Sequence, residues 1–231
     1  MSLRASRARG TYVDRRTGRR RKLPRVPGIR HEQPHWDDGL VVVGVDEVGR
    51  GAWAGPVTCG AVVLSPTRRI YKLRDSKLLD ADRREQLEAR IHEHATAVSI
   101  GHAGNDEIDR WGMTEALRVA ARRAVDGLGL DVDAILLDGN FDYLATHPAP
   151  VTTIVKGDAH SSSIAAASIV AKVARDRLMV IADDEHPGYD FASNKGYPAP
   201  THVAGLDDLG PCRLHRHSWQ PIVARTTPRL W

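Results

Sequence analysis

Few features of a secreted or membrane protein occur in this sequence of 231 residues. It has two cysteines, Cys59 and Cys212, which are too few and too far apart for a disulfide framework. Such sparse cysteine usage favours a reducing compartment. No apolar run approaches the roughly 18 residues of a membrane-spanning helix, and the arginine-rich N-terminus lacks the apolar segment of a secretory signal. We therefore expect a cytoplasmic protein with no membrane segment.

Acidic residues are almost absent from the first part of the chain. Residues 1–30 contain 11 Lys or Arg and one acid, Asp14, so this segment has a net charge of about +10. The rest of the chain holds 22 basic and 28 acidic residues, a net charge of −6. A segment so rich in Arg, Gly and Pro has little to bury. Two interpretations stay open: a disordered leader, or a nonspecific tether to nucleic acid that acts by counterion release.

Strands and helices are expected to alternate along the rest of the chain. We expect residues 1–38 to form a basic, flexible tail and residues 39–231 to form one domain, in which residues from about 185 to 231 are a small helical part. Apolar runs bounded by turn residues predict strands at residues 41–45, 57–64, 97–100, 134–137 and 151–155. Helical patterns cover residues 80–94, 104–127 with a break at Gly112, and 158–183 with Asp158 as its N-cap. This alternation predicts an α/β domain with a mixed sheet.

Four acidic side chains stand where the expected strands end or the longest helix begins: Asp46, Glu47, Asp138 and Asp158. Ligands of α/β sheets gather at strand ends. Clustered carboxylates repel one another, and burying them is costly unless a cation compensates. Mg²⁺ or Mn²⁺ prefers oxygen ligands and activates water in phosphoryl transfer. The four acids together therefore predict a metal site, although Asp138 alone also fits a turn and Asp158 alone fits a helix cap.

The glycine-rich segment after the first two acids invites a nucleotide-binding interpretation. Gly49, Gly51 and Ala54 match the dinucleotide pattern G-x-G-x-x-G/A, but that pattern needs a helix directly after it. Here Pro56 and a strand follow, and the Walker pattern is absent. A strand–loop–strand connection is favoured instead. Its glycines would let the backbone approach a ligand closely, and Arg50 would reach a phosphate.

Several segments, taken in order, resemble the ribonuclease HII family. They are "GVDEVGRGAWAGPV" from Gly44, "DSK" from Asp75, "LLDGN" from Leu136, "KGDAHSSSIAAASIVAKVARDR" from Lys156 and "NKGYP" from Asn194. The likeness covers residues from about 40 to 220. It implies a ribonuclease-H-like mixed sheet flanked by helices, with a small helical C-terminal part.

The resemblance also implies an activity and a substrate. The activity is metal-dependent cleavage, with Mg²⁺ or Mn²⁺, of the RNA strand of RNA–DNA hybrids and of single ribonucleotides embedded in duplex DNA. The products are 3′-hydroxyl and 5′-phosphate ends. No membrane partner is implied, and we expect a monomer. The tail remains a candidate for nonspecific contact with nucleic acid.

The resemblance assigns roles residue by residue. Asp46, Glu47, Asp138 and Asp158 would be the catalytic, metal-binding acids. Gly49, Arg50, Gly51 and Tyr197 would recognise the ribonucleotide, whose 2′-hydroxyl distinguishes RNA from DNA. Lys77, together with Lys172, would contact phosphates. Without the resemblance, we would favour a partly buried loop residue for Tyr197 and a solvated side chain for Lys77.

Other patterns compete with this interpretation. Cys212, His215 and His217 resemble part of a zinc site, but a structural zinc needs four ligands at suitable spacing. Asp176 next to Arg175 is expected to form a structural ion pair, and the small residues of "SSSIAAASIVAK" are expected to pack their helix closely on the sheet. Two other functions remain open: a noncatalytic nucleic-acid binding module, and another nuclease of the ribonuclease H fold such as a junction resolvase.

Overall fold

The structure is a computed structural model, and it describes residues 11–13, 20–22, 26–71, 73, 76 and 79–226. A five-stranded sheet in the order β5-β4-β3-β6-β7 forms its centre. The strands are β3 (Val42–Val48), β4 (Val57–Val63), β5 (Ala97–Ala103), β6 (Ala134–Asp138) and β7 (Val151–Ile154). Strands β5, β4 and β3 pair antiparallel, while β3, β6 and β7 pair parallel. The mixed sheet is as predicted.

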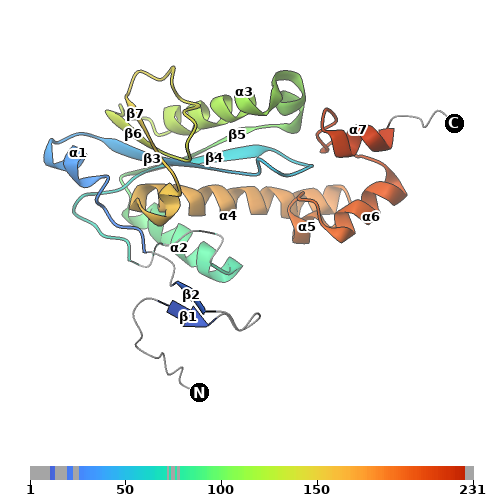
Figure 1. The fold of residues 1–231 in the computed structure, drawn as a ribbon, viewed down its shortest axis with the longest axis horizontal. Coiled ribbons are helices and arrows are strands. Elements are labelled where there is room, and N and C mark those ends of the chain that lie inside the picture. Colours follow the sequence, from blue (N-terminus) through green and yellow to red (C-terminus); the bar gives the residue numbers. More distant parts are fainter. Residues whose placement is uncertain are drawn as a thin grey trace.

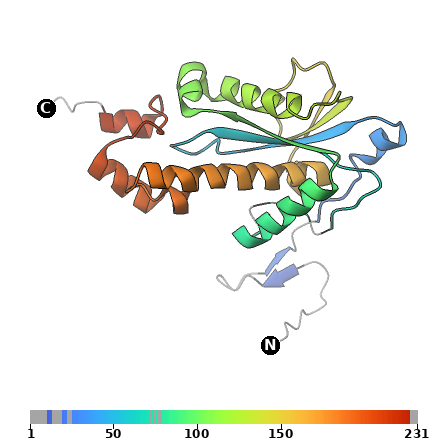
Figure 2. The same cartoon turned by 180° about the vertical axis from the view of Figure 1, so that it is seen from behind.

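Helices cover both faces of this sheet (Figures 1 and 2). Helix α3 (Asn105–Asp126) lies on one face, and α2 (Ala81–His94) and α4 (Ser162–Glu185) lie on the other. Three short helices gather beyond the far end of α4: α5 (Phe191–Asn194), α6 (Pro200–Leu209) and α7 (Gln220–Thr226). Among the described residues, no helix is long and apolar enough to cross a membrane.

Strand alternation sends neighbouring side chains of β3 to different layers. Val43 and Val45 belong to the core under α3, whereas Gly44 faces α4. A methyl group at Gly44 would collide with the backbone of Ser163, so α4 approaches the sheet more closely than any larger residue would permit. The small residues at the start of α4 therefore serve close packing, as predicted.

Helix boundaries follow the expected signals with one exception. Asp80 caps α2 by accepting a hydrogen bond from the Arg83 N–H at 2.8 Å. Gly112 interrupts α3 with φ +78°, which confirms the predicted break. Asp158, however, does not cap α4. It lies in a separate 3₁₀ turn, η2 (Gly157–Ala159), and Ser161 is the cap, since its side chain accepts from the Ile164 N–H at 3.2 Å.

Part of the expected tail is packed into the domain. The backbone of Gly28 bridges to Ser161, and the buried Glu32 accepts hydrogen bonds from the hydroxyls of Ser161 and Ser163 at 2.6 and 2.7 Å. Helix α1 (Gln33–Asp37) follows. Upstream, β1 (Thr11–Val13) pairs antiparallel with β2 (Arg20–Lys22). Residues 1–10, 14–19 and 23–25 lie outside the described residues, so the expected flexibility there stays a prediction.

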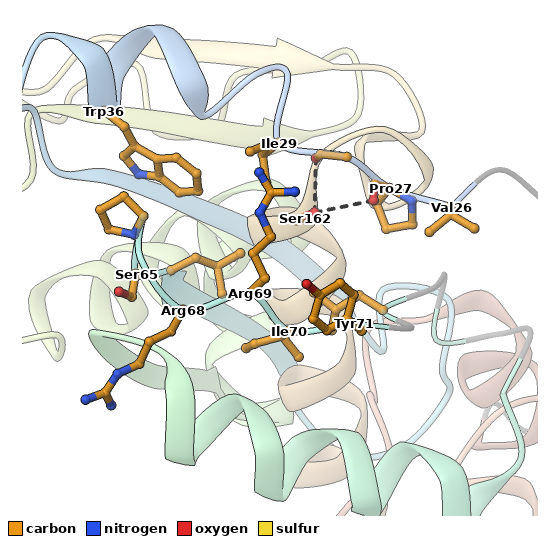
Figure 3. Close-up of a pocket in the computed structure, with 14 residues that line it drawn as sticks. Val26, Pro27, Ile29, Trp36, Ser65, Arg68, Arg69, Ile70, Tyr71 and Ser162 are labelled. Carbon is orange, nitrogen blue, oxygen red and sulfur yellow. Dashed lines mark hydrogen bonds between the residues drawn. The ribbon is translucent and has the colours of Figure 1, made fainter.

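The N-terminal segment also walls a pocket of about 220 Å³ (Figure 3). Trp36, Ile29 and Ser162, at the start of α4, are among the residues that line it, together with Ile70 and Tyr71. None of the acids or glycines predicted to form the functional site contributes to this lining. The predicted functional site therefore lies elsewhere, at the ends of β3 and β6.

Candidate active site

Asp46 lies near the C-terminal end of β3, where that strand runs beside β6. The register pairs Val45 with Leu137, so the next residue on each strand is one of the predicted acids, Asp46 and Asp138. We expected this strand to end at residue 45, but β3 continues through Asp46 and Glu47. The parallel ends of two neighbouring strands therefore bring these carboxylates together.

The Asp46 carboxylate is buried on the face of the sheet that α4 covers. It is 5% exposed, accepts a hydrogen bond from the Glu47 N–H at 2.8 Å, and is hydrogen-bonded to Ser168 on α4. Ser168 in turn contacts Ser76 at 2.9 Å between hydroxyl oxygens. Burial raises the pKa of Asp46 well above its usual value, and repulsion by Asp138 is the next largest cause.

Glu47 points to the opposite face, as strand alternation predicts. Its carboxylate accepts a hydrogen bond from the buried Tyr143 hydroxyl at 3.2 Å and lies 3.8 Å from the Arg50 guanidinium. Burial raises the pKa of Glu47, and the hydrogen bond from Tyr143 opposes that rise. The two adjacent acids thus flank the end of β3 from both sides.

Asp138 and Asp158 complete the group from β6 and η2. The Gly157 N–H donates to Asp138 Oδ1 at 2.6 Å, which ties the turn carrying Asp158 to the end of β6. Asp158 is 6% exposed, and its negative charge adds to the repulsion that raises the pKa of Asp46. All four predicted acids therefore act electrostatically on one another or on Asp46.

These acids fit a hard divalent cation by their chemistry. They offer only carboxylate oxygens, which Mg²⁺ and Mn²⁺ prefer, and buried like charges need such a counter-charge. Within the described residues, no three His, Cys, Asp or Glu side chains are already close enough to hold a metal ion as they stand. A bound cation would supply the positive charge that offsets the repulsion among these carboxylates.

The glycine loop after β3 contacts Tyr197. The Gly49 N–H donates to the Tyr197 hydroxyl at 3.0 Å. Gly49 has φ +89°, and a side chain there would collide with Arg175. At Gly51, by contrast, an added methyl group would meet no atom within 4 Å, and the Arg50 side chain is 58% exposed. The outer face of the loop is therefore open to a ligand.

Two buried arginines, Arg175 and Arg216, hold this loop by hydrogen bonds to its backbone, a role that sequence reasoning missed for both. Arg216 donates to the carbonyl oxygens of Gly49 at 2.6 Å, Arg50 at 3.0 Å and Gly55 at 3.0 Å. Arg175 donates to three further carbonyls, including that of Pro56 at 2.8 Å. Burial lowers the pKa of Arg216 to about 9. These acceptors are backbone carbonyl oxygens that lie between 20 and 167 residues away in sequence, so no local pattern of residues indicated the contacts.

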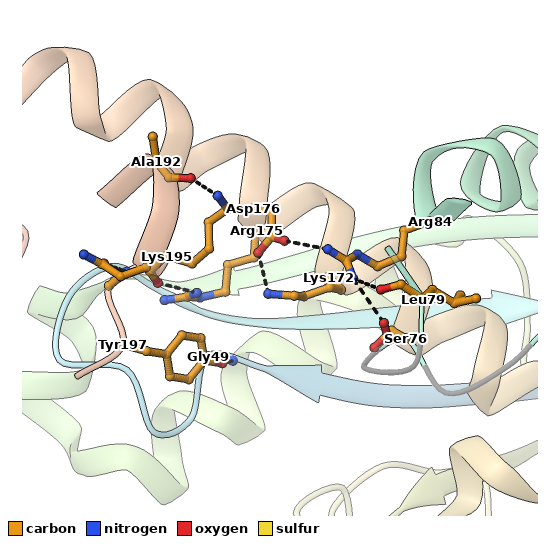
Figure 4. A network of polar contacts seen from close by, with 12 residues as sticks. Gly49, Ser76, Leu79, Arg84, Lys172, Arg175, Asp176, Ala192, Lys195 and Tyr197 are labelled. Carbon is orange, nitrogen blue, oxygen red and sulfur yellow. Dashed lines mark hydrogen bonds and ion pairs between the residues drawn. The ribbon is translucent and has the colours of Figure 1, made fainter. Parts of the chain in front are cut away.

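A polar network links the loop to α4 and α2 (Figure 4). Lys172 pairs with Asp176 at 2.7 Å and lies 6.0 Å from the centre of the Tyr197 ring. Asp176 also faces Arg84 at 3.7 Å, so the expected pair with Arg175 is wrong: the Arg175 guanidinium is engaged by backbone carbonyls. Lys77 lies outside the described residues.

The zinc-like trio has a different role. His215 is hydrogen-bonded to His202 at 3.0 Å between their Nε2 atoms, and its Nδ1 accepts from the Cys212 N–H at 2.9 Å. Both of its ring nitrogens are therefore already engaged by protein groups. His217 is exposed, and its N–H donates to Asp109 at 2.8 Å.

Comparisons with known proteins agree with this geometry. The family model described as Ribonuclease HII matches residues 43–222. Ribonuclease HII of Streptomyces avermitilis is 49% identical over 184 residues, which cover 80% of this chain and 78% of that protein. The structure of ribonuclease H2 from Pyrococcus horikoshii OT3 superposes with a TM-score of 0.70 at 26% identity, over 80% of this chain and 96% of that one.

A more distant structure shares the fold. Bst-RNase HIII in complex with Mn²⁺ superposes with a TM-score of 0.63 at 20% identity, covering 80% of this chain and 69% of that one. The matched family region contains β3 to β7 and the helices on both faces, together with the four acids. By that match and by its near-half identity to curated relatives, the chain belongs to the ribonuclease HII family, whose members cleave the RNA of RNA–DNA hybrids.

Proposed function

We propose that this protein hydrolyses the phosphodiester bond on the 5′ side of ribonucleotides, both in RNA–DNA hybrids and at single ribonucleotides embedded in duplex DNA. The products would carry 3′-hydroxyl and 5′-phosphate ends. The observation that supports this most is the gathering of Glu47, Asp138 and Asp158 around the buried Asp46. Such a cluster of carboxylates, of which Asp46 and Asp158 are buried, is costly unless a cation compensates it.

We propose that the four acids hold Mg²⁺ or Mn²⁺, in keeping with the Mn²⁺ named for Bst-RNase HIII. When bound, such an ion supplies a Lewis acid and an activated water for attack on phosphorus. The chain's own contribution is to fix the ligands. Ser168 holds Asp46, the Tyr143 hydroxyl holds Glu47, and the Gly157 N–H holds Asp138. Rigid placement of this kind limits the reorganisation needed during reaction.

We further propose that the glycine loop reads the 2′-hydroxyl of the ribonucleotide. The open space beside Gly51 supports this role, because backbone groups there are accessible and no side chain intervenes. The Tyr197 hydroxyl accepts a hydrogen bond from the Gly49 N–H, so its ring would stand beside the next sugar of a substrate held at this loop. A second 2′-hydroxyl there would be crowded. The exposed Arg50 side chain is suited to a phosphate, which positions the duplex without reading sequence.

A cleavage assay on defined substrates tests this proposal. End-labelled duplexes would carry one ribonucleotide, an all-RNA strand against DNA, or DNA only, and a branched DNA would be included. With Mg²⁺ or Mn²⁺ we expect one cut 5′ of the single ribonucleotide, cleavage of the hybrid, and none of the DNA substrates. Binding without any cleavage would favour a binding module. Cleavage confined to branched DNA would favour a resolvase.

The variant Gly51→Ala tests the role of the loop separately from folding. Its added methyl group meets no protein atom within 4 Å, so the melting temperature should stay at the wild-type value. We expect kcat/KM on the single-ribonucleotide duplex to fall at least about tenfold, because the methyl group blocks the approach of the sugar. Gly28→Ala, whose added methyl group also meets no atom within 4 Å, is the matched control. Unchanged kcat/KM in Gly51→Ala would exclude close approach at this position.

A further inference from the structure

Two fully buried histidines, His202 on α6 and His215 before α7, belong neither to the acids nor to the glycine loop. Their Nε2 atoms are 3.0 Å apart, and both rings have no exposed surface. Phe191 lies edge-on to His202 with ring centres 5.3 Å apart, and Tyr189 lies edge-on to His215 at 4.9 Å. A polar pair placed this deeply in an aromatic cluster must satisfy its own hydrogen bonds.

The hydrogen-bond partners fix where the protons are. The Tyr197 carbonyl can only accept, so His202 donates to it from Nδ1 at 2.9 Å. A neutral His202 then has Nε2 as an acceptor, and His215 must donate from its own Nε2. His215 Nδ1 is left as an acceptor and receives the Cys212 N–H at 2.9 Å, which is a shorter contact than the 3.2 Å between the same nitrogen and the Cys212 carbonyl oxygen. Both rings are neutral, since burial lowers the pKa of His215 to about 4 and also lowers the pKa of His202.

This series of hydrogen bonds connects the segment around Cys212 to the glycine loop. It runs from the Cys212 backbone through the two histidines to the carbonyl of Tyr197, whose hydroxyl accepts from the Gly49 N–H at 3.0 Å. The residue after His215 is Arg216, which donates to the Gly49 carbonyl at 2.6 Å. One short C-terminal segment therefore holds both partners of the Gly49–Tyr197 contact.

We propose that His202 and His215 are positioning residues that set Tyr197 against Gly49 through a single arrangement of protons. The connection of the two histidines to Gly49 and Tyr197 rests on hydrogen bonds alone. The effect on substrate choice rests, in addition, on the proposed function.

Nuclear magnetic resonance of ¹⁵N-histidine-labelled protein tests the proton arrangement without any substrate. At pH 7, the spectrum should show His202 as the Nδ1–H tautomer and His215 as the Nε2–H tautomer, with assignments made from His202→Asn and His215→Gln. An Nε2–H tautomer at His202, or a charged ring at either position, would overturn the proposal whatever the enzyme cleaves.

Two substitutions of similar size at His202 then separate positioning from simple packing. In His202→Asn the amide nitrogen stands near the former Nδ1 and keeps the donor to Tyr197, whereas in His202→Gln the amide lies near the former Nε2 and loses it. We expect the preference for a single-ribonucleotide duplex over a continuous RNA–DNA hybrid, measured as the ratio of kcat/KM, to fall about fivefold more in His202→Gln. That factor is the size expected for one lost hydrogen bond.

The outcomes also distinguish this inference from the proposed function. Equal ratios in both variants, with wild-type enzyme cleaving as proposed, would contradict positioning by the histidines. If the wild-type enzyme did not cleave at ribonucleotides, the proposed function would fail while the tautomer measurement still judged the hydrogen-bond chain.

Discussion

At the scale of single residues, Asp46 carries its carboxylate in a nearly closed environment next to three other acids. Burial and repulsion both raise its pKa, and only hydrogen bonds such as that with Ser168 oppose them. Groups held in this way are typical of functional sites, where local stability is given up for chemistry. Removing the charge should therefore stabilise the fold and abolish the activity.

The variant Asp46→Asn tests this exchange. In the absence of divalent cations we expect its free energy of unfolding to rise by on the order of 1 kcal/mol, because the repulsion from Asp138 is relieved. Urea denaturation with EDTA present would measure the change. Ser168→Ala, which removes a neutral partner of Asp46, should instead destabilise the protein. A lower stability of Asp46→Asn would contradict the account of repulsion.

His215 gives a pH dependence with a definite sign. Burial lowers its pKa to about 4 in the folded protein, against about 6.5 in an unfolded chain. Between these values the unfolded chain binds a proton that the folded protein does not, so stability falls as the pH falls from about 6.5 towards 4. One such proton contributes a slope of up to about 1.4 kcal/mol per pH unit.

Thermal unfolding from pH 7 to pH 4.5 measures that slope. We expect the loss of stability to be shallower in His215→Gln than in the wild type. His217→Gln, an exposed histidine two residues along the chain, is the control. If the two variants had the same slope, His215 would not be the source of the pH dependence.

At the scale of secondary-structure elements, the start of α4 is held by a residue outside the matched family region. Glu32 Oε1 accepts from the Ser161 and Ser163 hydroxyls and from the Ser163 N–H at 2.8 Å, and its Oε2 has no partner among the described residues. The family match begins at residue 43. This contact therefore ties an N-terminal segment of this chain to the turn that carries Asp158.

Substitution of Glu32 tests how much its hydrogen bonds with Ser161 and Ser163 contribute to the stability of the fold. Glu32→Ala should lower the free energy of unfolding by about 2–3 kcal/mol, because three donors at the helix start lose the acceptor that they share. Glu32→Gln keeps an acceptor oxygen and should lose less. Urea denaturation monitored by circular dichroism would compare the two variants. Equal losses would show that the carboxylate itself matters here, rather than side-chain volume or a single acceptor oxygen.

The elements also show where sequence reasoning succeeds. Local patterns predicted the strands, the cap at Asp80 and the break at Gly112, because each depends on neighbouring residues. Asp158 was misplaced as a cap because a 3₁₀ turn and a helix start share the same residue preferences. Arg175 and Arg216 were missed because their acceptors are carbonyl oxygens distant in sequence, which leave no residue pattern.

At the scale of the whole molecule, charge separates the N-terminus from the domain. Residues 1–25 hold 10 Lys or Arg and one Asp, a net charge of +9, ahead of a body with net negative charge. The four acids repel a polyanionic substrate, so a basic arm would offset that repulsion at a distance. Because Gly28 and Glu32 are packed into the domain, the arm is best removed before residue 26.

Deletion of residues 1–25 should weaken binding to duplex substrate mainly at low salt and flatten the dependence of log K on log salt. Binding by fluorescence anisotropy between about 50 and 200 mM salt would measure it. The melting temperature is the control for folding. An identical salt slope in the deleted and full-length proteins would show that the arm does not touch nucleic acid.

The central claim is that the four acids form one metal-dependent catalytic site. The most direct measurement is cleavage of a duplex with one ribonucleotide by Asp46→Asn and Asp138→Asn, compared with the wild type in Mg²⁺ and in Mn²⁺. We predict a loss of at least about a thousandfold in kcat for either variant, since each removes a charged ligand from the reacting centre. Undiminished cleavage by either variant in either metal would contradict the account.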